Sequence, residues 1–198
     1  MTGCRIAVHD WVTGSRVNGP GRRTVLWVQG CSLGCPGCFN PRTHEVHDTS
    51  ATVTSLLLEL IAADPNAEGL TIGGGEPLEQ PDAIAELAAG WRAATGTGVI
   101  ILTGLTWEEI EQDPATLTAA RQADLVIAGR YNERLRIGEG LRGSSNKTYH
   151  FLTDEYRIDQ VTNLPEFEAV IGKDGTVHVT GVAGSHSLAQ ALRPQPPR

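Results

Sequence analysis

Short apolar segments rich in β-branched residues alternate with helical segments along the first two-thirds of the chain, and this alternation most constrains the fold. Residues of this kind are typical of buried strands. A helix between two strands favours a parallel βα unit, because parallel strands need a long crossover. We therefore expect an α/β fold, either an open sheet or a partial (β/α) barrel, with strands at 24–30, 69–72, 98–104 and 123–129.

The segments between these strands carry helix signals. At 52–63 the apolar residues recur with helical spacing. A second helix is expected over 81–95, because Pro81 suits a helix start and Gly96 follows the end. A third is expected to open at Thr106, where acidic residues in the first turn interact favourably with the helix dipole.

The pattern changes after about residue 150. Two apolar runs within 167–181 surround the turn residues 173–175, which predicts a β-hairpin. The proline-rich end, 193–198, is expected to be a disordered tail. We therefore expect one core domain over 1–152, followed by a small C-terminal extension over 153–198.

The charge and hydropathy patterns argue against several classes of partner. The formal net charge is −7, the pI is about 5.3, and no segment is dense in Lys or Arg, so nucleic acid is not an expected partner. The longest apolar run, 56–63, is interrupted by Glu59 and is too short to cross a bilayer. No secretory signal is visible at the start, so we expect a cytoplasmic protein without a membrane partner.

Three of the four cysteines, Cys31, Cys35 and Cys38, lie in the stretch GCSLGCPGCFN after the first expected strand. In a reducing compartment, clustered cysteines indicate metal binding or catalysis rather than disulfides. An iron–sulfur cubane held by three thiolates would leave one iron open to a small molecule. The alternative is zinc, which usually binds two separated Cys pairs and would need a fourth ligand here. That ligand would have to come from Cys4, His44 or His47.

These features, taken in order, resemble a known superfamily. The pattern C-x3-C-x2-C follows the first strand and the stretch IGGGEP, 72–77, closes the second, as in the radical S-adenosylmethionine (SAM) superfamily. The segments N-G-P-G at 18–21 and R-G-S-S-N at 142–146 make the chain similar to the activating proteins of anaerobic ribonucleotide reductase, which are glycyl-radical-enzyme activases. The resemblance extends over residues 15–152.

The resemblance implies a partial (β/α) barrel of the radical SAM type, in which a [4Fe–4S] cluster is held by Cys31, Cys35 and Cys38. SAM would bind the fourth iron, and its reductive cleavage would give a 5′-deoxyadenosyl radical. The enzyme would be an oxidoreductase that generates a glycyl radical on a partner resembling anaerobic ribonucleotide reductase. A flavodoxin or ferredoxin-type protein would supply the electron.

The resemblance also implies two sets of SAM contacts. On the amine side, three consecutive glycines allow a close approach of the backbone, and a carboxylate can accept a bond from the SAM ammonium. Outside this context such a stretch would be a plain tight turn. An aromatic ring on the adenine side could equally be core. The two sets are Gly74, Gly75 and Glu76 for the amine, and Gly37, Cys38 and Phe39 for the adenine.

Further residues have more than one interpretation. The N-G-P-G segment resembles the loop that faces the protein substrate in activases, but is also a common β-turn. The segment 142–146 has either a structural or a SAM-side role. Thr103 and Gly104 end a strand where ligands usually bind. Two other functions stay open: a radical SAM enzyme that modifies a peptide, another protein or a small molecule, and a non-catalytic metal-binding or electron-transfer module.

Overall fold

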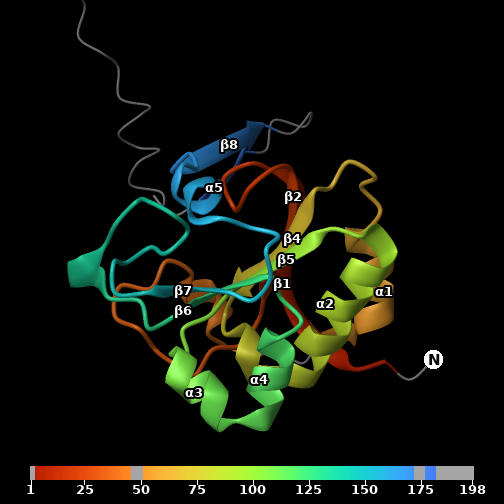
Figure 1. The fold of residues 1–198 in the computed structure, drawn as a ribbon, viewed down its shortest axis with the longest axis horizontal. Helices are drawn as coiled ribbons and strands as arrows, with labels where there is room; N and C mark the ends of the chain where they lie inside the picture. The colour runs from red at the N-terminus through yellow and green to blue at the C-terminus, as the bar shows by residue number, and fades with distance from the viewer. Residues whose placement is uncertain (1–2, 46–50, 172–176, 182–198) are drawn as a thin grey trace, which may run out of the picture.

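A computed structural model describes residues 3–45, 51–171 and 177–181 (Figure 1). Seven strands form one sheet in the order β3-β1-β2-β4-β5-β6-β7. The central strands β2, β4, β5 and β6 are parallel, whereas β1 and β3 on one side and β7 on the other are antiparallel to their neighbours. The strands are β1 Arg5–Ser15, β2 Arg23–Val28, β3 Ala51–Val53, β4 Gly69–Gly74, β5 Gly98–Leu102, β6 Leu125–Ala128 and β7 Thr148–Phe151.

The predicted α/β fold is confirmed and is built on one large mixed sheet, in which the four expected strands correspond to the parallel strands β2, β4, β5 and β6. The edge strand β7 was not predicted. It is short, and none of its side chains is fully buried, so it lacks the apolar pattern of the central strands. Within the described part of the chain, no helix is both long and apolar enough to span a membrane.

Two of the three predicted helices begin where their sequence signals place them; α4 and α5 were not predicted. Helix α2 starts at Pro81 and ends before Gly96, whose φ of +69° suits glycine. Thr106 caps α3 through a reciprocal bond with Glu109. The helices are α1 Thr54–Ile61, α2 Pro81–Thr95, α3 Trp107–Gln112, α4 Pro114–Ala120 and α5 Ile158–Thr162, with short 3-10 turns η1 Pro41–Thr43, η3 Pro77–Glu79 and η4 Glu133–Leu135.

The expected helix over 52–63 is wrong at its start. Residues Ala51–Val53 form strand β3, which pairs antiparallel with Arg5–Ala7 at the edge of the sheet. Thr52 and Val53 are β-branched and favour a strand when a partner edge is available. The helix therefore begins only at Thr54.

The core is divided between the two faces of the sheet. Alternate residues of the parallel strands, such as Leu26, Ile72 and Ile101, pack with helices α1 to α4 in the larger cluster. Trp91 of α2 is fully buried there. A smaller cluster on other strand residues, including Ile100 and Ile127, includes Val161 of α5.

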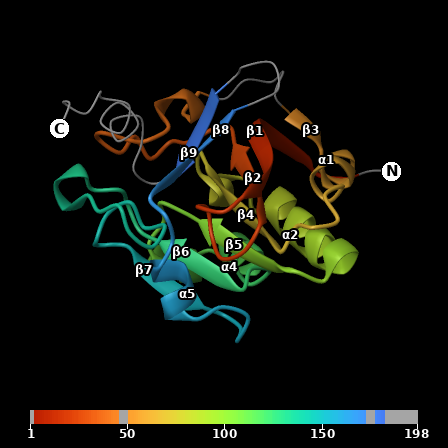
Figure 2. The same cartoon turned by 90° about the horizontal axis from the view of Figure 1, so that it is seen from above.

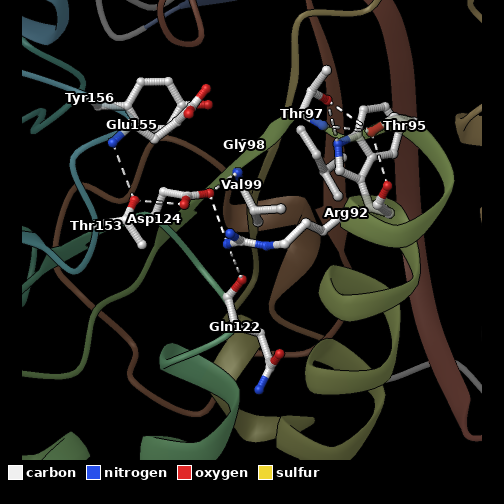
Figure 3. A network of polar contacts seen from close by, with 12 residues as sticks. Arg92, Thr95, Thr97, Gly98, Val99, Gln122, Asp124, Thr153, Glu155 and Tyr156 are labelled. Atoms are coloured by element: carbon white, nitrogen blue, oxygen red, sulfur yellow. Dashed lines mark hydrogen bonds and ion pairs between the residues drawn. The ribbon is translucent and has the colours of Figure 1, made fainter.

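The buried carboxylate of Asp124 connects three segments of the chain at a place away from the cysteine loop (Figure 3). Asp124, just before β6, accepts bonds from the Arg92 guanidinium at 2.9 Å, the Val99 amide at 2.8 Å and the Thr153 hydroxyl at 2.7 Å. These partners come from α2, β5 and the segment after β7. The network lies at the amino ends of β5 and β6, so it fixes the end of the scaffold opposite to the strand carboxyl ends.

The predicted C-terminal hairpin is confirmed as a separate two-stranded sheet of β8, Phe167–Ile171, and β9, Val177–Gly181. Its strands are antiparallel, with Phe167 opposite Gly181. In Figure 2 the hairpin, drawn in blue, lies beside β1 and β2. The predicted turn at 173–175 and the predicted tail at 193–198 lie outside the described residues.

Candidate functional site

A cavity of about 700 Å³ opens at the carboxyl ends of the parallel strands. Its walls come from the loops after β2, β4 and β5, from residues 141–147 and from the hairpin strand β9. In sheets of parallel strands, ligands bind at this end because the loops converge there. A volume of this size suits a small-molecule cofactor.

The cysteine loop forms one wall of the cavity. Cys31, Cys35 and Cys38 all line it, and each is half-buried and free of disulfides. Burial, and more weakly the nearby carboxylates of Glu76 and Glu79, raise the pKa of the Cys31 thiol. The loop therefore presents three thiols to a common space.

Backbone bonds hold the two ends of this loop. The Gly30 amide donates to the Thr43 carbonyl at 2.8 Å, and the Cys31 amide donates to the His44 carbonyl at 3.1 Å. The Cys38 amide closes a turn on the Cys35 carbonyl at 3.2 Å. Among the residues that the structure describes, no three His, Cys, Asp or Glu side chains lie close enough together to hold a single metal ion.

The other candidate metal ligands differ in their placement. His44 lines the cavity, and its Nε2 atom is buried with no hydrogen-bond partner in the described chain. Cys4 is not among the cavity residues; its amide donates to the Glu86 carboxylate at 2.9 Å. His47 lies outside the described residues. The structure therefore places three cysteines on the wall of one cavity and leaves the fourth outside it.

The glycines at the end of β4 allow two backbones to lie against each other. A Cβ on Gly75 would lie 2.1 Å from the Gly30 carbonyl oxygen, and one on Gly74, whose φ is +106°, would lie 2.6 Å from the Val28 nitrogen. The Gly75 amide donates to the Val28 carbonyl at 2.9 Å. These glycines seat the strand end directly on β2 and the start of the cysteine loop.

The Glu76 carboxylate lies in the cavity wall and is 1% exposed. Its Oε1 atom accepts from the Thr103 hydroxyl at 2.6 Å and from the Leu78 amide at 2.9 Å. Its Oε2 atom accepts from the Gly104 amide at 2.7 Å. Burial raises the pKa of this carboxyl, and the three hydrogen bonds act in the opposite direction. Glu76 thus links the end of β4 to the end of β5.

Lys147 is a cavity residue that the sequence analysis did not single out. Its ammonium donates to the Thr103 carbonyl at 3.3 Å, beside the Glu76 network. Burial lowers the pKa of this lysine, while the charge of Glu76 acts to raise it. The sequence signal for Lys147 was only its position one residue after the R-G-S-S-N segment.

The two remaining residues of the expected adenine side are placed differently. Phe39 lines the cavity with its ring 4.5 Å from that of Tyr131, and the Arg136 guanidinium lies 5.1 Å above it. Gly37 is not on the cavity wall, and a Cβ there would meet the Glu133 carboxylate at 2.6 Å.

The segment 142–146 has both cavity-facing and structural contacts, the two alternatives that its sequence left open. Arg142 and Gly143 line the cavity. Ser144 accepts a bond from the Asn132 amide at 3.2 Å, and the Asn146 side chain donates to the Arg130 carbonyl at 2.9 Å. The first half of the segment therefore faces the cavity, and the second half anchors the loop after β6.

Comparison with known proteins gives a consistent set of relatives. A family model described as a 4Fe-4S single cluster domain matches residues 17–150. The anaerobic ribonucleoside-triphosphate reductase-activating protein of Enterobacteria phage T4 is 33% identical over 143 residues, covering 70% of this chain and 89% of that protein. The protein of the same name from Escherichia coli strain K12 is 30% identical over 153 residues, covering 73% and 97%.

Two other matches cover less of the chain. The pyruvate formate-lyase-activating enzyme of Staphylococcus epidermidis is 36% identical over 86 residues, covering 40% of this chain and 34% of that enzyme. The crystal structure of QueE from Escherichia coli covers 52% of this chain and 54% of that one, with a TM-score of 0.45 and 18% identity. Residues 151–198, which include the hairpin, lie outside the family match.

Proposed function

We infer the function of this chain from its family: the chain belongs to the 4Fe-4S single cluster domain family and is an activase of the radical SAM type, similar to the activating proteins of anaerobic ribonucleoside-triphosphate reductase. We propose that it generates a glycyl radical on a partner enzyme resembling that reductase. The observation that carries this proposal is the shared cavity of the three cysteines, Gly75, Glu76 and Asn18 of the N-G-P-G segment.

The residues present fit a [4Fe–4S] cluster and SAM. Three thiols, unpaired with one another and lining one cavity, are the donor set expected for a cluster with an open iron. When bound and reduced, the cluster supplies the electron that cleaves SAM to a 5′-deoxyadenosyl radical. Cys31, Cys35 and Cys38 would hold the cluster.

The chain's own residues orient the cofactor. Glu76 offers a buried carboxylate for the ammonium group of SAM, since its Oε2 atom accepts only the Gly104 bond and can accept another, whereas Oε1 already accepts two. Thr103 and Gly104 keep that carboxylate in one orientation, so little ordering is needed on binding. Gly74 and Gly75 would bring backbone groups close to SAM, and Gly37, Cys38 and Phe39 would form the adenine side.

The proposal also covers the fold, the domain bounds, the electron donor and the target. We propose that the sheet is the partial (β/α) barrel of radical SAM enzymes, that 1–152 is the core domain and that 153–198 is an extension. A flavodoxin or ferredoxin-type protein would deliver the electron in the cytoplasm. The similarity to pyruvate formate-lyase-activating enzyme supports a glycine-bearing protein as the target.

A second function keeps the radical chemistry but changes its target to a peptide, another protein or a small molecule. The hairpin favours keeping it, since β9 lines the cavity and lies outside the family match. A non-catalytic metal module is disfavoured, because it would have no use for a buried carboxylate beside the three thiols.

The experiment that tests the proposal counts SAM cleavage events. The anaerobically reconstituted protein is mixed with reductant and SAM, with or without the anaerobic ribonucleoside-triphosphate reductase of its own organism. An activase should release about one 5′-deoxyadenosine per activated site, because the radical is stored on the partner. Many turnovers that do not depend on the reductase would favour the second function, and no cleavage under any condition would contradict both.

A further inference from the structure

The hairpin β8–β9 lies directly at the mouth of the candidate site. Val179, Thr180 and Gly181 of β9 line the same cavity as the three cysteines. Figure 2 shows both strands beside β1 and β2. The described strands of the hairpin, 167–171 and 177–181, form no strand pair with the large sheet, so other contacts must hold them there.

The polar contacts of the hairpin converge on the segment that begins the N-G-P-G loop. The Asn18 side-chain amide donates to the Thr180 hydroxyl at 2.9 Å, and the Arg16 backbone amide donates to the Glu168 carboxylate at 3.1 Å. Asn18 also donates to the Ser15 hydroxyl at 2.8 Å, so both amide hydrogens are used. One hydrogen-bonded asparagine therefore joins the hairpin to the loop.

The loop side of this contact is firmly fixed. The Asn18 carbonyl accepts from the Thr71 hydroxyl at 2.6 Å, and that hydroxyl accepts from the Arg23 guanidinium at 2.7 Å. Arg23 is fully buried, and a Cβ on Gly19 would lie 2.5 Å from its side chain. A displacement of the loop would have to disturb this buried arginine, which is costly.

The hairpin side is held more loosely. A second cavity of about 240 Å³ lies between it and β1, lined by Trp11, Val12 and Val179 among others. The Oε1 atom of Glu168 is buried, and no hydrogen-bond donor meets it within the described residues. Incomplete packing and an unsatisfied polar atom both weaken the closed arrangement.

From this asymmetry we propose that the β8–β9 hairpin is a latch over the cavity mouth, closed by the Asn18–Thr180 bond, and that the glycine-bearing segment of the partner displaces it on entry. The inference rests on the proposed function for the identity of the entering segment. A segment centred on glycine suits the opening because it has no side chain at the reacting carbon. While closed, the hairpin would shield the cavity from solvent and oxygen.

The test uses the full-length, cluster-loaded protein and the variant Thr180→Val, which keeps the shape of the side chain and removes the hydroxyl. Backbone amides of 177–181 should exchange hydrogen about two- to tenfold faster in the variant, the range expected for loss of one neutral hydrogen bond. Air should bleach the cluster faster by a similar factor. The matched control is Thr162→Val, whose hydroxyl donates within α5 and lies away from the cavity wall; it should behave as wild type.

Binding to the partner distinguishes a latch from a docking surface. A closed latch lowers the apparent affinity, because only the open fraction can bind. Thr180→Val should therefore bind the anaerobic ribonucleoside-triphosphate reductase of its own organism more tightly than wild type. Weaker binding, or unchanged exchange and bleaching, would overturn the latch. If exchange and bleaching respond as expected but no reductase binds to any form, the latch stands and the proposed partner is wrong.

Discussion

The Thr103 hydroxyl donates a 2.6 Å hydrogen bond to the Glu76 carboxylate, joining the end of β5 to the end of β4 beneath the cavity. The carboxylate is 1% exposed, so the charge that we assign to SAM binding also organises the two loops. SAM binding and loop anchoring can be tested separately, because replacing Thr103 removes one anchoring bond and leaves the Glu76 charge in place.

The first prediction compares Glu76→Gln with Thr103→Val. Both variants disturb the network, but only Glu76→Gln removes the charge, and a charge-assisted bond contributes about 1.5–3 kcal/mol. SAM binding, measured by equilibrium dialysis on the cluster-loaded protein, should weaken roughly ten- to a hundredfold in Glu76→Gln. It should weaken less in Thr103→Val.

The exposed Glu59→Gln on α1 serves as the control and should bind SAM as wild type does. Equal losses in Glu76→Gln and Thr103→Val would mean that the carboxylate acts only by anchoring the loops, and the direct contact with SAM would have to be abandoned.

The second prediction concerns pH. Burial raises the pKa of Glu76 above its ordinary value of 4.5. Between pH 4.5 and the pKa of the folded state, the folded protein therefore binds more protons than the unfolded protein. The contribution of this carboxyl is fully present below pH 4.5 and is lost as the pH rises through the folded pKa. Denaturant unfolding of the cluster-free protein should show wild type losing stability relative to Glu76→Gln over that interval. A constant difference between the two would contradict the assigned environment.

The third prediction uses two neighbouring glycines as a matched pair. A Cβ on Gly75 would lie 2.1 Å from the Gly30 carbonyl oxygen, whereas a Cβ on Gly73 would meet only the Leu102 side chain at 3.5 Å. Gly75→Ala should destabilise the protein by about 1–3 kcal/mol or more, because backbone must move. Gly73→Ala should change the free energy of unfolding little. Thermal unfolding and iron uptake of both variants would test the pair, and equal behaviour would argue against the close approach.

The fourth prediction concerns the metal. The reconstituted protein should bind about four irons per chain, as a cubane requires. Changing Cys31, Cys35 or Cys38 singly to Ala should abolish the visible absorption of the cluster. Cys4→Ala should not, because Cys4 lies apart from the cavity beside Glu86. Stoichiometric zinc in protein purified without air, with no uptake of iron, would point to the zinc alternative.

Local sequence patterns predicted much of the scaffold. The parallel strands are apolar and β-branched, and α2 runs from its proline to its glycine signal, so their positions follow from neighbouring residues. Edge strands were harder to predict from local sequence patterns. Ala51–Val53 becomes a strand only because β1 offers an edge, and the β1 residues that it pairs with, Arg5–Ala7, lie more than 40 residues earlier in the sequence.

In the candidate site, too, features set by neighbouring residues could be predicted and features set by distant segments could not. The cysteine and glycine motifs are short, and the structure places them in one cavity. Lys147 and the contact between Asn18 and Thr180 could not be predicted, because they depend on how distant segments fold over the strand ends. Lys147 lies 44 residues from Thr103, and Thr180 lies 162 residues from Asn18. No local spacing encodes such pairs.

Electron paramagnetic resonance of the partner after activation tests the proposed activase function directly. The cluster-loaded protein, reductant and SAM are mixed without air with the anaerobic ribonucleoside-triphosphate reductase of its own organism. We expect a glycyl radical doublet on the reductase, absent when SAM is left out and absent with Cys35→Ala. If SAM is instead consumed over many turnovers and no protein carries a stored radical, the activase function is contradicted.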